Sequence, residues 1–416
     1  MFPPNTELTM SMITNRALIV LRNDLTFSRT VNHQYDKSFG VDGAKIGATI
    51  NLRKPVRYIG NPGPTMVPES FTETFVPLTL TSQYNVGLNF TTSELMLSID
   101  EFDDRVLKPA VATLANKIDF DGLALALQVA NFVGIPGQTP SAALTFMQAK
   151  TALDNNAAPV DDNRSVTINS LTESYMVDAL KGLYNRSGEI GEQNVKGRMA
   201  TGFGWDKWYM DQNVYTQTIG ALGGTPVVSA GGQTGSQIAI SGCSDNIAGW
   251  LNQGDIVSFA GVQGVNPQNR QPWGTLQPFV LTAPVTTSNT GTATLNIYPA
   301  IVLTGAYQTV NASPINGAAV YVYGLLTTSN PAQSAIAGIT SPQNLGYHKD
   351  AFTVACVDLP VPRNVELGAR AADEDVGFSV RILRNYDIYQ DGLPTRLDVL
   401  YGWCAMRPEL AVRIVG

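Results

Sequence analysis

The stretch GDIVSFAGV, residues 254–262, decides how the middle of this chain is interpreted. A Gly-Asp turn leads into a short run of apolar and small residues, which predicts a strand entered by a tight turn. Val257 and Phe259 share parity along that strand, so we expect both side chains to face the core of the surrounding module, with Asp255 at the turn. The stretch therefore places β-structure in the centre of the chain.

The sequence around this stretch is very poor in charge. Between residues 212 and 348, the charged residues are Asp245, Asp255 and Arg270. Short alternating segments such as SQIAI and TATLNIYPAIV are separated by Gly, Pro, Asn and Thr, which is typical of an all-β module of small strands. We predict that residues 223–345 form an inserted all-β domain with clustered termini, and that its core contains Val257 and Phe259.

Before this block, the hydrophobic period changes several times. Residues 9–25 have helical spacing and predict a short amphipathic helix. Residues 44–90 alternate along two arms that flank a Pro/Gly-rich tip at 60–70, which predicts a long β-hairpin that needs a surface to lie on. Residues 98–133 return to helical spacing and predict a helix of roughly 50 Å, kinked or split at Pro109.

Further helices are expected at 141–154 and 170–185, on either side of a short strand with the sequence SVTIN. Charge returns after residue 347, where alternating segments predict strands up to the end of the sequence. The simplest interpretation is an α+β chain in which one mixed domain is interrupted by the all-β insertion.

Composition limits the classes of function. The 416 residues suggest about two or three domains. Charged residues make up 15%, below the roughly 25% of typical soluble proteins, which leaves neutral surface of the kind often buried against other chains. The net charge of −7 gives no support to a broad nucleic-acid footprint.

The sequence shows no pattern of a catalytic or metal site. Neither His33 nor His348 lies in a hydrolase or metalloprotease motif, and the cysteines form no CxxC pair. The acidic run at 100–104 suits a helix start, and the one at 373–375 lacks the spacing of a calcium loop. We therefore expect no catalytic residue, no metal and no cofactor.

The first residues lack the basic start and apolar core of a secretory signal. No apolar run approaches the roughly 18 residues of a spanning helix. We therefore expect a soluble protein that is made in the cytoplasm and has no contact with a membrane.

Several stretches of this sequence, taken in order, resemble one family. NHQYD and GAKIGATINLRKPVRY are similar to its entry to an extended loop, SIDEFDDRVLKPAVATLANKID to its spine helix, and LYGWCAMRPELAVRI to its last peripheral-domain strand. The family is that of the major capsid proteins of tailed bacteriophages, in particular the coat proteins of short-tailed enterobacterial phages with an inserted β-barrel domain.

The resemblance implies the Hong Kong phage-type capsid fold. The expected parts are an N-terminal arm at 1–38, an extended hairpin loop at 39–90, a spine helix and peripheral domain at 91–140, an axial domain at 141–222, the inserted domain at 223–345, and a return to the axial and peripheral domains at 346–416.

The resemblance also implies a function without catalysis. Copies of the chain would assemble through hexamers and pentamers into an icosahedral shell around a double-stranded DNA phage genome. Expected partners are the chain itself, a scaffolding protein, a portal and packaged DNA bound without sequence specificity. The expected location is the virion capsid, assembled in the host cytoplasm.

The predicted hairpin leads to a specific hypothesis about contacts between subunits. Its alternating face needs a cover, and we expect a neighbouring subunit to supply part of it. Arg53, Lys54 and Arg57 would then meet acidic groups across that contact. The alternatives are a β-rich surface or glycan-binding protein and, less favoured because the motifs are missing, an intracellular hydrolase.

Overall fold

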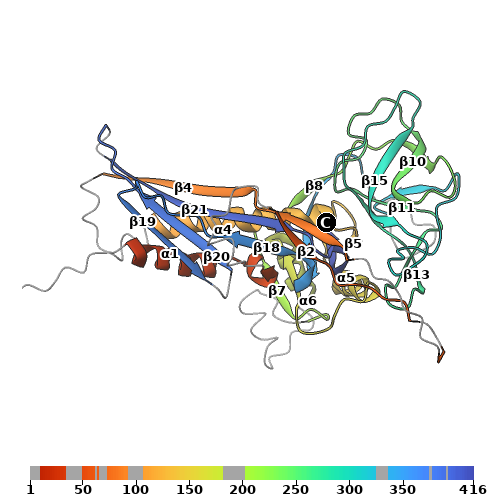
Figure 1. Ribbon diagram of the computed structural model, residues 1–416. Coiled ribbons are helices and arrows are strands. Elements are labelled where there is room, and N and C mark those ends of the chain that lie inside the picture. The colour runs from red at the N-terminus through yellow and green to blue at the C-terminus, as the bar shows by residue number, and fades with distance from the viewer. Residues whose placement is uncertain are drawn as a thin grey trace, which may run out of the picture. The chain divides into compact units, whose positions relative to one another are not determined.

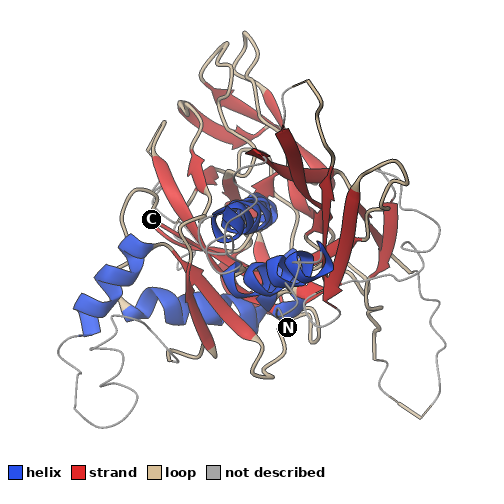
Figure 2. Ribbon diagram, turned by 90° about the vertical axis from the view of Figure 1, so that its left-hand side faces the viewer, coloured by secondary structure: helices blue, strands red, loops and turns tan. Residues whose placement is uncertain are grey.

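The computed structural model describes residues 10–33, 49–60, 63–64, 73–91, 106–180, 202–324, 336–373, 377–389 and 392–416. These residues form a mixed α+β structure in which strands predominate and helices are few (Figure 2). The chain divides into two compact units. The first unit comprises residues 1–53, 75–122 and 352–406, and the second comprises 54–74, 123–351 and 407–416.

The first unit is built on a sheet whose central strand is β21. The order is β1 (Asn32–His33), β18 (Thr353–Val357), β21 (Gly392–Cys404), β20 (Phe378–Arg384) and β19 (Leu367–Asp373), with β4 (Ser82–Thr91) also paired to β21. Residues Thr395–Asp398 of β21 pair with β20, and Leu400–Cys404 pair with β18. Strand β4 pairs antiparallel with most of the length of β21 (Figure 1).

Helix α1 (Met10–Asp24) packs on this sheet against β19 and β20 (Figure 1). Ile13, Ala17 and Leu21, which follow one another at helical spacing, are buried, whereas Met12 and Ile19 are about half exposed. The amphipathic helix predicted for residues 9–25 is confirmed over α1.

Helix α4 (Lys108–Leu123) is held in the first unit by its acidic residues. The buried Asp119 carboxylate accepts bonds from the backbone N–H of Thr26 at 2.7 Å and of Ser28 at 2.9 Å. The Tyr401 hydroxyl of β21 donates to Asp121 Oδ2 at 2.7 Å. At Gly122 a Cβ would lie 2.6 Å from the indole ring of Trp403, so the close approach requires glycine.

The long helix predicted for 98–133 is wrong at its far end. After α4 the chain forms the 3-10 helix η4 (Ala124–Gln128) and the strand β5 (Phe132–Gly134). Phe132 lies in register with Arg413 of a parallel strand, and this tertiary pairing overrides the helical spacing. Residues 98–105 lie outside the described ranges, so the kink or split expected at Pro109 stays a prediction.

The predicted hairpin is confirmed over a short section. Strand β2 (Thr49–Arg53) pairs antiparallel with β3 (Phe75–Thr79). Residues 44–48 and most of the tip lie outside the described ranges. The second arm does not continue as expected to residue 90, because β4 leaves the hairpin and pairs with β21.

Burial on both sides of the break explains why one alternating pattern covers two strands. Leu78 of β3 and Leu80 after it are both fully buried, and they pack with Leu52, Ala355 and Val357. Every second residue therefore stays apolar from β3 into β4, although the two strands pair with different partners. The alternation in the sequence does not reveal the change of partner.

The second unit contains a sheet centred on β22 (Ala411–Val415). The order is β5, β22, β17 (Thr340–His348), β6 (Arg164–Ile168) and β7 (Lys207–Met210), with β8 (Thr216–Thr218) also paired to β17. Helix α5 (Ala143–Asn155) packs against β22 and β5, and α6 (Ser170–Leu180) follows β6. Both helices predicted here are confirmed over these described residues.

The charge-poor block forms a second, antiparallel sheet in the same unit. Its order is β16 (Val320–Val322), β11 (Ile256–Phe259), β14 (Phe279–Leu281), β15 (Ala293–Ile301), β10 (Gly235–Cys243) and β9 (Gly224–Val228), with β12 (Gln263–Val265) and β13 (Pro272–Leu276) paired beside it. Val228 N donates to Ala318 O at 2.9 Å and Gly317 N to Val228 O at 2.9 Å, so the segment before β16 meets β9 and closes the sheet on itself.

Val257 and Phe259 lie on β11 with no exposed surface, inside one large apolar cluster. The ring of Phe259 packs on Phe279 with centroids 5.4 Å apart. The compact second unit includes both sheets, and residue 345 lies inside β17. A separate domain at 223–345 therefore stays a prediction.

Candidate functional site

The three cations expected at a subunit contact divide between the two units of the chain, with Arg53 in the first and Lys54 and Arg57 in the second. Arg53 ends β2, and its guanidinium lies 6.0 Å from the centroid of the Phe75 ring. Lys54 continues the pairing of the hairpin arms, because its backbone N–H donates to Thr74 O at 2.9 Å. The side chains of Lys54 and Arg57 line a groove in the second unit, and Arg53 is not among the groove residues.

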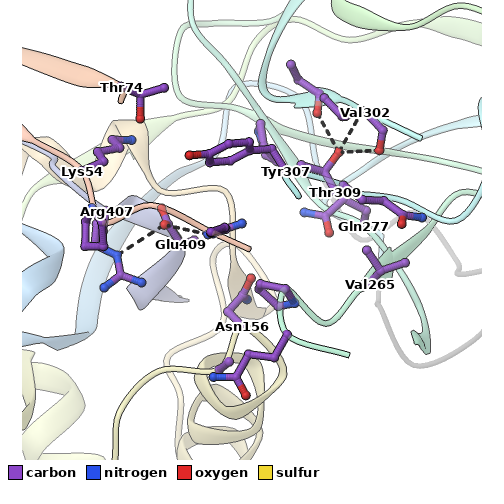
Figure 3. A pocket seen from close by; sticks show the side chains of 18 of the residues that line it. Lys54, Thr74, Asn156, Val265, Gln277, Val302, Tyr307, Thr309, Arg407 and Glu409 are labelled. Carbon is purple, nitrogen blue, oxygen red and sulfur yellow. Dashed lines mark hydrogen bonds and ion pairs between the residues drawn. The ribbon is translucent and has the colours of Figure 1, made fainter. Parts of the chain in front are cut away.

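The groove has a volume of about 800 Å³ and lies between several parts of the second unit (Figure 3). The base of the hairpin forms one wall, and loops and strands of the charge-poor block form another. The aromatic side chains on it are Tyr58, Trp273, Tyr298 and Tyr307. Its volume lies within the range of roughly 300–1,000 Å³ that is usual for ligand pockets.

Charge in the groove is organised around Glu409. Arg57 donates to Glu409 Oε1 at 3.2 Å, and the Arg407 guanidinium lies 3.6 Å from the same oxygen, so one carboxylate serves two cations (Figure 3). The Arg57 guanidinium also lies 5.9 Å from the centroid of the Tyr307 ring. Burial raises the pKa of Tyr298, and the negative charge of Glu409 raises it further.

The described groove residues therefore include more positive than negative charge. Lys54, Arg57 and Arg407 face one carboxylate, Glu409. Among the residues that the structure describes, the Lys54 ammonium has no ion-pair partner. The groove can accept a group that is both apolar and negatively charged.

Hydrogen bonds between side chains and backbone groups fix the walls of the groove. Glu409 lies in the 3-10 helix η7 (Pro408–Leu410), and Asn131 Nδ2 donates to both Glu409 O at 3.1 Å and Ala411 O at 2.9 Å. On the opposite wall Thr309 Oγ1 donates to Ala300 O at 2.7 Å and accepts from Val302 N at 3.0 Å, which closes the loop that carries Tyr307.

Arg407 and Glu409 lie within the stretch LYGWCAMRPELAVRI, but the sequence alone predicted no role for either residue. The signal was present, since opposite charges flank a proline there. The aromatic residues of the groove could not be singled out from a block that contains many scattered aromatics.

A second polar arrangement in the same unit is buried. Asp255 is at the turn before β11, as expected, but it has no exposed surface. Its carboxylate accepts from Asn252 N at 2.8 Å, Gly220 N at 3.0 Å and Gln217 Nε2 at 3.2 Å. Burial raises the pKa of Asp255, although these bonds and the charge of Arg413 oppose the rise.

Arg413 of β22 is also fully buried, and its Nη1 donates to Gln343 Oε1 at 3.4 Å. Burial lowers the pKa of Arg413, while Tyr323 and Asp255 oppose this change. Asp255 comes from the charge-poor block and Arg413 from the other sheet of the unit, so each charge favours the ionised form of the other across the two sheets. Neither position carries a sequence signal for this burial.

The described residues contain no cluster of three or more His, Cys, Asp or Glu side chains that could hold a metal ion. His348 is buried, and its Nε2 lies 2.9 Å from Asp161 Oδ1. The pKa of Asp161 is lowered mainly by a hydrogen bond from Asn163, with a smaller contribution from His348. This His–Asp pair joins β17 to the loop before β6.

None of the helices in the described ranges is long and apolar enough to span a bilayer.

Comparisons with known proteins give one match to a family model. Residues 233–416 match the model described as "P22 coat protein - gene protein 5". No relative was found among curated proteins.

Solved structures with similar chains come from several phages. A chain from Mycobacterium phage Che8 is 10% identical, with a TM-score of 0.42, over 94% of this chain and 90% of that one. A chain in the capsid structure of the cyanophage P-SCSP1u is 10% identical, with a TM-score of 0.41, over 94% and 87%. A chain in the asymmetric unit of the bacteriophage PhiM1 mature capsid is 10% identical, with a TM-score of 0.41, over 94% and 86%.

The family match includes the strands β11, β17, β21 and β22. It also includes Glu409 and the buried residues Asp255 and Arg413. It also contains the stretches GDIVSFAGV and LYGWCAMRPELAVRI. The resemblance of this chain to the major capsid proteins of tailed phages is thus confirmed by the P22 coat protein family model over residues 233–416.

Proposed function

We propose that this protein is the major capsid protein of a tailed phage, with the Hong Kong phage-type fold. Copies assemble through hexamers and pentamers into an icosahedral shell that encloses a double-stranded DNA genome. The observation that carries the proposal is the match of residues 233–416 to the P22 coat protein family.

The physical character of the chain supports repeated contact between copies. Only 15% of its residues are charged, and low charge suits surfaces that become buried in an assembly. Many large apolar side chains of the described residues are exposed in the isolated chain, among them Leu144, Leu171 and Ile388. Contacts between unlike surfaces of identical subunits close into rings when the rotation permits it, as hexamers and pentamers require.

The proposal includes an inserted domain at residues 223–345. The closed antiparallel sheet of β9–β11 and β14–β16 supports it, because a closed sheet leaves no strand edge to be completed by the host domain. The Asp255 carboxylate, which accepts from Gly220 N and Gln217 Nε2, would then be an internal link between insertion and host.

The remaining parts of the proposal concern partners and place. The shell works with a scaffolding protein and a portal, it packages DNA without reading its sequence, and it is assembled in the host cytoplasm to become the virion capsid. Its role is structural, without catalysis. The low charge of the chain and the family match support these expectations indirectly.

Electron microscopy and sedimentation velocity of the purified protein at increasing concentration test the proposal. Closed shells or rings of subunits are expected. A uniform monomer at all concentrations, combined with affinity for oligosaccharides on a glycan array, contradicts the proposal and supports the alternative of a glycan-binding protein.

A further inference from the structure

The loop between β20 and β21 exposes apolar side chains at its tip. Tyr386 is 43% exposed, Ile388 73% and Tyr389 93%. Single exposed apolar residues are ordinary on protein surfaces, but three within four positions concentrate apolar surface at one turn, as interaction sites do.

The described part of this tip is held by its own hydrogen bonds. Asp387 Oδ1 accepts from Tyr389 N at 2.9 Å, and Asp387 N donates to Gly392 O at 2.9 Å. A preformed turn loses little conformational entropy on binding, which favours its use as a docking element. The tip therefore presents two large apolar groups, Ile388 and Tyr389, around one carboxylate.

The groove in the second unit has the complementary character. Its aromatic walls include Trp273 and Tyr307, and its lining has more positively than negatively charged side chains. Lys54 has no ion-pair partner among the described residues, and Arg407 shares its carboxylate with Arg57. An apolar tip that carries the Asp387 carboxylate would cover aromatic surface and bring negative charge to Lys54.

We infer that the tip of residues 386–389 in one copy docks into this groove of a second copy. The inference rests on the proposed function, which makes another copy the neighbour of every subunit. Tip and groove are different surfaces, so the contact is heterologous and can repeat around a closed ring. The volume of about 800 Å³ suits a few side chains rather than a whole domain, which fits a loop tip as occupant.

Disulfide trapping between separately prepared subunits tests the contact. One variant carries Tyr389→Cys and the other Gln268→Cys, an exposed residue at the groove. The native cysteines Cys243, Cys356 and Cys404 are all buried, so background cross-linking is low. The variants are mixed, allowed to assemble and oxidised, so that any link between the two new cysteines must join two copies.

Covalent dimers on a non-reducing gel are expected from this mixture. A matched mixture of Thr234→Cys, an exposed polar site between β9 and β10, with Gln268→Cys is expected to give no more dimer than the native chain. When Tyr389→Cys and Gln268→Cys lie in the same chain, a head-to-tail contact predicts a ladder of covalent oligomers. A reciprocal contact predicts dimers alone and overturns the inference.

Charge is tested without disturbing the turn. Asp387→Asn keeps an oxygen that can accept from Tyr389 N but removes the charge, and Lys54→Gln removes the opposing cation. Each change is expected to lower the yield of trapped dimer, and the double variant to lower it little further, because both remove the same attraction. Equal yields from all four proteins overturn the charge complementarity on which the inference stands.

The outcomes separate this inference from the proposed function. Particles in the microscope without trapped dimers overturn the docking and leave the shell intact. Trapped dimers without particles support the docking and count against the shell. A mixture with neither particles nor dimers overturns both.

Discussion

Removing the buried carboxylate of Asp255 is expected to destabilise the second unit strongly. Asp255→Ala leaves the backbone N–H groups of Gly220 and Asn252 buried without their acceptor, where the bonds are now 3.0 and 2.8 Å. It also removes the negative charge that acts on the fully buried Arg413.

The magnitude follows from these losses. An unsatisfied buried donor costs about 1–3 kcal/mol. The backbone N–H groups of Gly220 and Asn252 both lose their acceptor, so we expect the free energy of unfolding to fall by about 2–6 kcal/mol. Arg413→Met should also destabilise, and the double variant should reveal a coupling energy of about 0.5–3 kcal/mol.

Urea unfolding followed by tryptophan fluorescence measures this change. Trp250 is buried in the apolar cluster of the charge-poor block, and its Nε1 donates to Gly223 O at 3.0 Å, so it reports on this region. Asp245→Ala, at an exposed aspartate of the same block, is the matched control and should change stability by less than about 0.5 kcal/mol. A loss below about 1 kcal/mol for Asp255→Ala, with an unchanged denaturant slope, would refute the reasoning.

The pH dependence gives a second check with a definite sign. Burial raises the pKa of Asp255 in the folded state above the value of about 3.9 in an unfolded chain. The folded state then holds the proton more tightly, so the contribution of this group is fully present below about pH 3.9 and is lost as pH rises through the folded pKa. The stability of the native chain minus that of Asp255→Asn should therefore fall across this window and level off above it; a difference that rises with pH contradicts the assignment.

Three further changes have defined outcomes. Phe259→Ala truncates a fully buried ring in the apolar cluster and should cost about 3–5 kcal/mol in urea unfolding, whereas a loss under about 1 kcal/mol would show that the site is not core. Burial raises the pKa of Cys243 to about 11 and of Cys356 to about 12, so at pH 8 Ellman's reagent should react slowly with these thiols and with the buried Cys404 until urea unfolds the chain; rapid reaction of the folded protein contradicts this. Deleting residues 60–70 should leave a folded subunit that assembles poorly in sedimentation velocity, and normal assembly would remove the hairpin tip from the proposed contact.

Sequence patterns correctly predicted the helices and strands that pack against a single partner along their whole length. Ile13, Ala17 and Leu21 mark one face of α1, which packs on one sheet from end to end. The alternation in β3 and β4 was equally clear, but it did not show that the first strand pairs with β2 and the second with β21. The alternation of buried and exposed positions stays the same when a strand changes its partner. A single sequence therefore does not show where that change occurs.

The misplaced helix and the buried charges have a different cause. Phe132 has helical spacing with the residues before it, yet its strand is selected by pairing with β22, whose residues come some 280 positions later. Asp255 was interpreted as a turn residue, because a lone charge beside glycine ordinarily faces solvent. Its burial depends on donors from Gly220 and Gln217, and no spacing rule connects those positions to it.

The place of β22 in its sheet sets the order in which the second unit can be completed during synthesis. Residues 411–415 form an interior strand between β5 and β17, and their side chains are all buried. Every other strand of that sheet leaves the ribosome earlier. The position between β5 and β17 therefore stays unoccupied until residues 411–415 have been synthesised. A chain terminated before residue 411 would lack the strand that joins β5 to β17. Incomplete chains therefore cannot complete this sheet, however much of the second unit has already folded.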